Sequence, residues 1–109
     1  MSPEELQKTA LDAISQLWPG LDLRKLRRGS KDQEIVFARW VLTDLLHTQA
    51  GLSRRIVAEL LNWRSSGSVA YAASALMRDV ETNRVRAQRV SEAESLFRRL
   101  LEGRALTLA

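Results

Sequence analysis

The apolar residues of this chain recur at three- and four-residue intervals, which is the spacing of amphipathic helices rather than of strands. The first such stretch begins at Leu6, and its apolar positions are Leu6, Ala10, Ala13, Ile14, Leu17 and Trp18. Ser2, Pro3 and Glu5 precede it with the spacing of a capping box, and Pro19-Gly20 follows it. The pattern therefore predicts an N-terminal helix that ends at Pro19.

A second strong pattern starts after residue 30. Its apolar positions predict one buried helix face, formed by Ile35, Ala38, Val41, Leu42, Leu45 and Leu46. We expect Ser30 and Gln33 to cap this helix and Gly51 to end the connection that follows it. Between the first two helices, Leu21, Leu23 and Leu26 can anchor a short helix before Gly29-Ser30 breaks it.

The central stretch, residues 51–80, predicts two helices joined by a tight turn. Ser53 is suited to cap the first, and Asn62 tolerates the left-handed conformation that ends a helix. A second cap is expected at Ser65 or Ser66. The predicted apolar positions are Ile56, Val57, Leu60 and Leu61 in the first helix and Val69, Ala72, Ala73, Leu76, Met77 and Val80 in the second.

The last part of the chain predicts a helix end and a polar link over residues 81–90, followed by one more helix. Ser91 and Glu94 have the spacing of a capping box, and the apolar positions are Ala93, Leu96, Phe97, Leu100 and Leu101. Gly103 is expected to end this helix and residues 104–109 to form a tail. The prediction is an all-α domain of five to six helices over residues 1–103, with a central helix-turn-helix.

The second helix of the central pair has small or polar side chains at its start, from Ser66 to Tyr71. Arg54, Arg55 and Arg64 add positive charge around that end. A helix with a bare N-terminal face after a tight turn is typical of a helix-turn-helix, whose second helix enters the DNA major groove. An ordinary helical hairpin inside a bundle has the same pattern and stays an alternative.

Charge favours a polyanionic partner. The 109 residues carry a formal net charge of +4, and five basic residues lie between residues 24 and 31, namely Arg24, Lys25, Arg27, Arg28 and Lys31. Such a loop suits phosphate contacts or a narrow minor groove. A solvated charged surface is the alternative.

Nothing in the sequence indicates catalysis or a metal site. Cysteine is absent, the single histidine, His47, has no obvious partner, and no glycine-rich phosphate loop occurs. Asp44, Glu59 and Asp79 show no obvious pairing, and we expect them to be solvated. The expectation is a protein without enzymatic activity, metal or cofactor. Because no signal peptide or long apolar run is seen, we also expect a cytoplasmic, nucleoid-associated protein.

From residue 5 to residue 102 the order of elements resembles the C-terminal DNA-binding domain of the bacterial replication initiator DnaA. Leu17-Trp18 stands where the family has an aromatic pair, and residues 26–31 stand where it has a basic loop. Ala38-Arg39-Trp40-Val41 is similar to the family's Ala-Arg-Gln-apolar helix. Residues 63–69, Trp-Arg-Ser-Ser-Gly-Ser-Val, fall on the family signature Gly-Arg-Asp-His-Thr-Thr-Val.

The resemblance implies roles for single residues. It places Lys31 at the minor groove, Arg39 beside the DNA backbone, Ser66 to Ser68 at base edges and Tyr71 at a phosphate. The base-reading histidine of the signature is replaced here, and Trp40 stands where the family has a glutamine. The resemblance thus implies DNA binding through the scaffold, with low sequence selectivity. Similar domains also occur in transposase-like proteins and in short stand-alone regulators.

The resulting hypothesis is binding of double-stranded DNA, in replication, transposition or their regulation. The predicted DNA-binding residues are Arg27, Arg28, Lys31, Arg39, Trp40, Arg54, Arg55, Arg64, Ser65, Ser66, Gly67, Ser68 and Tyr71. Two alternatives stay open. The same scaffold could bind a protein partner or self-associate through Trp40 and Tyr71, or the chain could be a fragment of a larger transposase or initiator relative.

Overall fold

The computed structural model of the chain describes residues 1–27, 30–63 and 66–108, without the side chains of residues 27, 107 and 108. Within these residues there is no strand, which confirms the predicted all-α class. The five α-helices are α1 (Pro3–Leu17), α2 (Gln33–Thr43), α3 (Arg54–Leu60), α4 (Gly67–Thr82) and α5 (Arg84–Leu108). A short 3-10 helix, η1 (Leu23–Arg27), precedes α2, and a π-helical segment, η2 (Asp44–Gln49), extends it.

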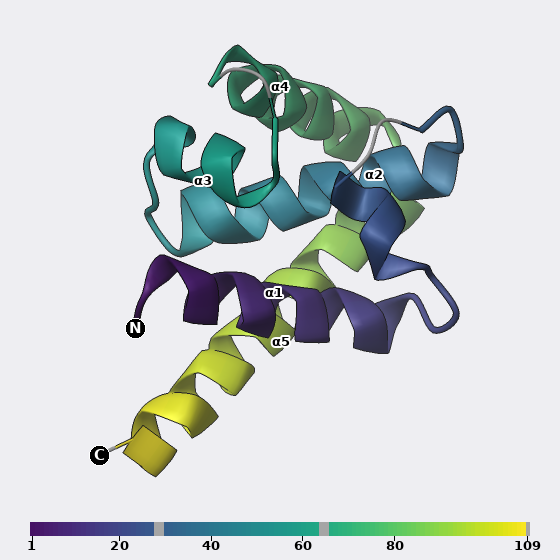
Figure 1. Cartoon of the computed structure of the whole chain (residues 1–109). Helices are drawn as coiled ribbons and strands as arrows, with labels where there is room; N and C mark the ends of the chain where they lie inside the picture. Colours follow the sequence, from purple (N-terminus) through teal and green to yellow (C-terminus); the bar gives the residue numbers. More distant parts are fainter. Residues whose placement is uncertain (28–29, 64–65, 109) are drawn as a thin grey trace.

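Helix α2 forms the centre of the molecule. In Figure 1, α4 and α3 lie on one side of it and α1 lies on the other, while α5 crosses obliquely and packs against both α1 and α4. The last turns of α5 extend past the body of the domain, toward the side where the N-terminus lies (Figure 1). This arrangement leaves the start of α4 on the surface, next to α2.

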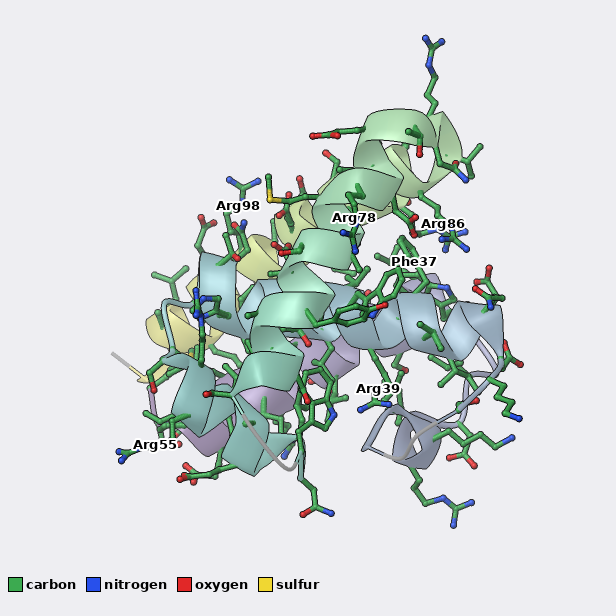
Figure 2. The ribbon with its side chains drawn as sticks, turned by 90° about the horizontal axis from the view of Figure 1, so that it is seen from above. Phe37, Arg39, Arg55, Arg78, Arg86 and Arg98 are labelled. Atoms are coloured by element: carbon green, nitrogen blue, oxygen red, sulfur yellow. The ribbon has the colours of Figure 1, made fainter. Side chains whose placement is uncertain are left out.

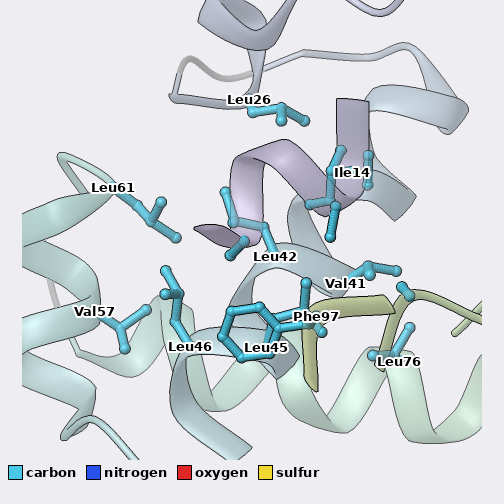
Figure 3. Close-up of a cluster of buried hydrophobic side chains, with 14 of the residues drawn as sticks. Ile14, Leu26, Val41, Leu42, Leu45, Leu46, Val57, Leu61, Leu76 and Phe97 are labelled. Carbon is cyan, nitrogen blue, oxygen red and sulfur yellow. The ribbon is translucent and has the colours of Figure 1, made fainter. Parts of the chain in front are cut away.

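The core forms around the predicted apolar face of α2 and η2. All six predicted positions of that face are at most 6% exposed. Figure 3 shows Leu42 and Leu45 in one cluster with Ile14 of α1, Phe97 of α5 and Leu76 of α4. The apolar pattern of the sequence thus located the central helix correctly.

The predicted cap of the first helix is confirmed, and that of the second is wrong. Ser2 Oγ accepts from the Glu5 amide at 3.2 Å, as the capping box predicts. The cap of α2 is Asp32 and not the predicted Ser30, because Asp32 Oδ1 accepts from the amides of Glu34 and Ile35. A carboxylate at this position also interacts favourably with the positive end of the helix dipole. Ser30 Oγ instead accepts from the Asp32 amide at 3.1 Å.

The predicted polar link after residue 80 does not exist. Helix α4 ends at Thr82, and α5 begins at Arg84 after a single intervening residue, Asn83, whose side chain accepts from the Arg86 amide at 3.0 Å. Helix α5 then continues without a break through Ser91 and Gly103 to Leu108. The predicted second capping box, the helix end at Gly103 and the tail over residues 104–108 are therefore wrong.

Tertiary contacts explain why this polar segment is helical. The Arg86 guanidinium lies 4.8 Å from the ring centre of Phe37, and the Arg89 guanidinium lies 5.1 Å from that of Trp18. Trp18 and Phe37 meet edge to face at 6.0 Å. Arg86 also pairs with Asp79, and Arg89 donates to the Leu17 carbonyl. We call Trp18, Phe37, Arg86 and Arg89 the inner cluster, because it joins α1, α2 and α5.

Two smaller differences concern side chains. Met77 was predicted to face the core, yet it is 64% exposed, and Ala75 is buried in its place. His47 has no obvious partner in the sequence, but in the structure it is half-buried and its Nδ1 lies 2.7 Å from the Leu52 carbonyl oxygen. Because a carbonyl can only accept, Nδ1 carries the proton, and the contact joins η2 to the segment that leads into α3.

Candidate nucleic-acid interface

Helices α3 and α4 are joined by a compact turn that the sequence largely encodes. Ser53 Oγ accepts from the Ile56 amide at 3.2 Å, so the predicted cap of α3 is confirmed. Asn62 has a φ of 57°, the left-handed conformation expected of it. The amides of Asn62 and Trp63 then bond back to the carbonyls of Glu59 and Ala58, as in a Schellman motif. This motif turns the chain away from α3 at Trp63.

The start of α4 is open to solvent. Ser66 occupies its cap position without a side-chain hydrogen bond, and Ser66, Gly67 and Ser68 are all exposed. The first amides of a helix carry partial positive charge, which favours negatively charged groups nearby. Short side chains at this end let another molecule approach the backbone closely.

A pocket of about 510 Å³ lies between α2 and the start of α4. It is lined by Val36, Arg39, Trp40, Trp63, Gly67, Ser68, Tyr71 and Ala72. Five of these residues, Arg39, Trp40, Gly67, Ser68 and Tyr71, were predicted as DNA-binding residues from the sequence. The fold brings them together although they come from segments about 30 residues apart. We call this set of eight residues the α2–α4 pocket.

Arg39 supplies the positive charge of the pocket. Its guanidinium lies 4.8 Å from the centre of the Trp63 ring, within the range of a cation–π interaction. Burial lowers the pKa of the Arg39 guanidinium below its usual value. An arginine nevertheless stays protonated in proteins, so the pocket keeps a partly desolvated cation at neutral pH. Figure 2 shows Arg39 beside the segment that precedes α2, while Arg55 points away on the other side of α4.

Aromatic rings form much of the remaining wall. Trp40 and Trp63 are half-buried and pack against the core, whereas Tyr71 is 63% exposed at the rim. The Trp63 Nε1–H is buried and has no hydrogen-bond partner among the described residues. Trp63 was not among the predicted DNA-binding residues, nor were Val36 and Ala72. The signal that could have found Trp63 is its place directly before the signature-like Arg64.

The other predicted residues that the structure describes do not line the pocket. Lys31 is exposed just before the Asp32 cap, and Arg54 and Arg55 are exposed in the first turn of α3. Arg55 Nε lies 4.0 Å from Glu59 Oε1. This ion pair is exposed to solvent and contributes little to the stability of the fold. Arg28, Arg64 and Ser65 fall outside the described residues, as does the side chain of Arg27.

Glu59 is exposed as expected, whereas Asp44 and Asp79 are not simply solvated. Asp79 pairs with Arg86, and Asp44 is partly buried near Glu94 of α5. The pKa of Asp44 is raised to about 7. Burial is the main cause and the neighbouring Glu94 carboxyl is the second, while a hydrogen bond with Thr48 acts in the opposite direction. Gln49 donates to Glu94 at 2.8 Å. None of these residues lines the α2–α4 pocket.

Comparison with protein-family models, with curated proteins and with solved structures finds no match for this chain. Within the described residues, no helix is long and apolar enough to cross a bilayer. The same residues contain no group of three or more His, Cys, Asp or Glu side chains placed to hold a metal ion. The geometry of the α2–α4 pocket is therefore the main guide to function.

Proposed function

We propose that the protein binds double-stranded DNA through α3 and α4, and that it acts in replication, transposition or their regulation. The observation that carries the proposal is the gathering of five predicted DNA-binding residues at the α2–α4 pocket, beside the exposed start of α4. In this arrangement α4 is the recognition helix and its first turn enters the major groove. Arg39 lies beside that turn and neutralises a backbone phosphate.

The charge around α4 fits a ligand with phosphates on both sides. Arg39 borders the first turn of α4 from α2, and Arg54 and Arg55 are exposed at the start of α3. Phosphate contacts of this kind position a protein on a duplex without reading its sequence. Gly67 and Ser68 offer no side chain that grips a base edge at two points, so we expect low sequence selectivity.

The test is a fluorescence anisotropy titration of a labelled random-sequence duplex at several salt concentrations. With about five phosphates neutralised, log affinity should fall with log salt at a slope of roughly −4 to −5. Arg39→Met should weaken binding about tenfold at low salt and reduce the slope by about 1. Arg98→Met is the matched control, since Arg98 is an exposed arginine of α5 outside the pocket (Figure 2).

Three results decide the outcome. Circular dichroism must first show that both variants fold like the parent. Binding that depends on Arg39 and not on Arg98 supports the proposal. Equal losses in the two variants would show that only total charge matters, and absence of parent binding at the lowest salt would reject duplex binding altogether.

A protein-interaction function is the second candidate, because large side chains are exposed on α4. Tyr71 and Met77 are 63% and 64% exposed, and tyrosine and methionine are enriched at protein interfaces. In this case the parent should self-associate in sedimentation velocity experiments, and Tyr71→Ser with Met77→Ser should abolish the association. Self-association without duplex binding would favour this function.

A further inference from the structure

The α2–α4 pocket has aromatic walls, which a recognition helix in the major groove of a paired duplex does not use. Its walls carry three aromatic side chains, Trp40, Trp63 and Tyr71, around a volume of about 510 Å³. Base edges in a paired duplex are read by hydrogen bonds and apolar contacts, whereas the flat face of a base is available only when the base is unpaired. Aromatic side chains recognise that face by stacking.

The volume and the charge are both suited to one nucleotide. Pockets for small organic ligands measure about 300–1,000 Å³ and combine apolar or aromatic walls with a few polar groups. Here the polar groups are the Arg39 guanidinium and the Ser68 hydroxyl, close to the partial positive charge at the start of α4. A planar ring that carries a phosphate matches both parts of this lining.

We propose that the α2–α4 pocket binds one unpaired nucleotide, with its base among Trp40, Trp63 and Tyr71 and its phosphate beside Arg39 and the first turn of α4. The inference rests on the proposed DNA-binding function and deepens it, since the nucleotide can belong to a DNA strand at a site where a base has left the helix. A free nucleotide carries the same chemistry and is the other source.

Tyr71 offers a clean substitution for the test. It is 63% exposed, so replacing it leaves the core intact. Tyr71→Leu removes the ring and keeps apolar bulk, whereas Tyr71→Phe keeps the ring and removes only the hydroxyl. Stacking predicts that Tyr71→Phe binds an unpaired base like the parent and that Tyr71→Leu loses about fivefold or more. Trp40→Leu provides a second variant in the pocket wall.

Three ligands separate the sources. Two labelled hairpin duplexes have the same sequence and a non-nucleotide linker as the loop, so that the control has no unpaired base, and one of them carries an additional unpaired adenine in its stem. Deoxyadenosine monophosphate is the free nucleotide, and quenching of tryptophan fluorescence reports its binding. The parent and Tyr71→Phe should bind the bulged hairpin at least about fivefold more tightly than the paired one, and Tyr71→Leu should bind both alike.

The outcomes distinguish this inference from the proposed function. Equal affinity of the parent for both hairpins overturns the unpaired-nucleotide inference and leaves duplex binding intact. If neither hairpin binds but the mononucleotide quenches fluorescence in the parent and Tyr71→Phe and not in Tyr71→Leu, the pocket binds free nucleotide and the duplex proposal is rejected. If no ligand binds, both are rejected.

Discussion

Arginines meet aromatic rings at two places along α2, and the two places differ in what surrounds them. In the inner cluster, Phe37 is 3% exposed and packs edge to face against Trp18. The two arginines of this cluster bond to groups of the chain itself, Arg86 to Asp79 and Arg89 to the Leu17 carbonyl. At the α2–α4 pocket, Arg39 lies over Trp63 beside an open volume of about 510 Å³. Phe37 and Arg39 are only two residues apart, about 200° around the helix axis.

The difference teaches that composition does not separate a structural cluster from a binding site. Both groups contain arginine and tryptophan, and both use the cation–π geometry. The inner cluster joins three helices and is closed by the chain's own groups. The pocket is bordered by Gly67, Ser68 and the exposed Tyr71, side chains too small or too exposed to fill it. Substitutions in the inner cluster should therefore change stability, and substitutions at the pocket should change binding.

The largest expected effect is on folding. Phe37→Ala removes a fully packed ring from the inner cluster and should lower the free energy of unfolding by about 3–5 kcal/mol. Urea denaturation followed by circular dichroism measures the change. A loss below about 1 kcal/mol would mean that Phe37 is not packed as described and that the contrast between the two regions fails.

A matched pair of arginine substitutions tests the same contrast with equal change in charge. Arg86→Met leaves the partly buried Asp79 without its partner and should lower the free energy of unfolding by about 1–2 kcal/mol. Its effect on duplex affinity should be small. Arg39→Met should show the reverse, with a smaller loss of stability and weaker binding. Urea denaturation and the anisotropy titration are run on both variants, and the same pattern in both would contradict the distinction.

A pH series tests whether stability and binding depend on different groups. The pKa of Asp44 is about 7 in the folded protein and near 3.8 when unfolded, so the folded state holds more protons between these values. The contribution of Asp44 to the free energy of unfolding is complete below about pH 4 and is lost as the pH rises to about 7 and above. The slope stays below about 1.4 kcal/mol per pH unit, because one partly solvated group is involved.

Asp44→Asn removes this titration while keeping the shape of the side chain. The free energy of unfolding of this variant, relative to that of the parent, should increase from about pH 5 to about pH 8, as measured by urea denaturation in matched buffers. Duplex affinity at constant salt should be the same in both proteins, since Arg39 does not titrate in this range. A pH-independent difference would show that Asp44 ionises normally.

The smallest expected effect on stability is that of Tyr71→Ala. An exposed side chain contributes little to folding, so the free energy of unfolding should change by less than about 0.5 kcal/mol. Thermal unfolding measures this, and a loss above about 1 kcal/mol would place Tyr71 in the structural group.

Local sequence patterns determined most of the helices. The apolar spacing located the buried face of α2, and the caps at Ser2 and Ser53 and the turn at Asn62 were readable because they depend on neighbouring residues only. The helix starts and the turn follow from hydrogen bonds and side-chain periods within one or two turns. Arg39, Trp40, Gly67, Ser68 and Tyr71 were predicted as a candidate site mainly from the family resemblance and not from these local patterns.

Tertiary structure alone decided the rest. The segment from Arg84 to Val90 looks polar, yet it is helical because Arg86 and Arg89 stack on rings contributed by α2 and the end of α1. Asp44 shows no pairing in the sequence, and its raised pKa comes from burial and from Glu94, 50 residues away. The pocket exists because α4 lies across α2, which brings Trp63 beside Arg39. Such contacts join residues far apart in the chain, and no local pattern encodes them.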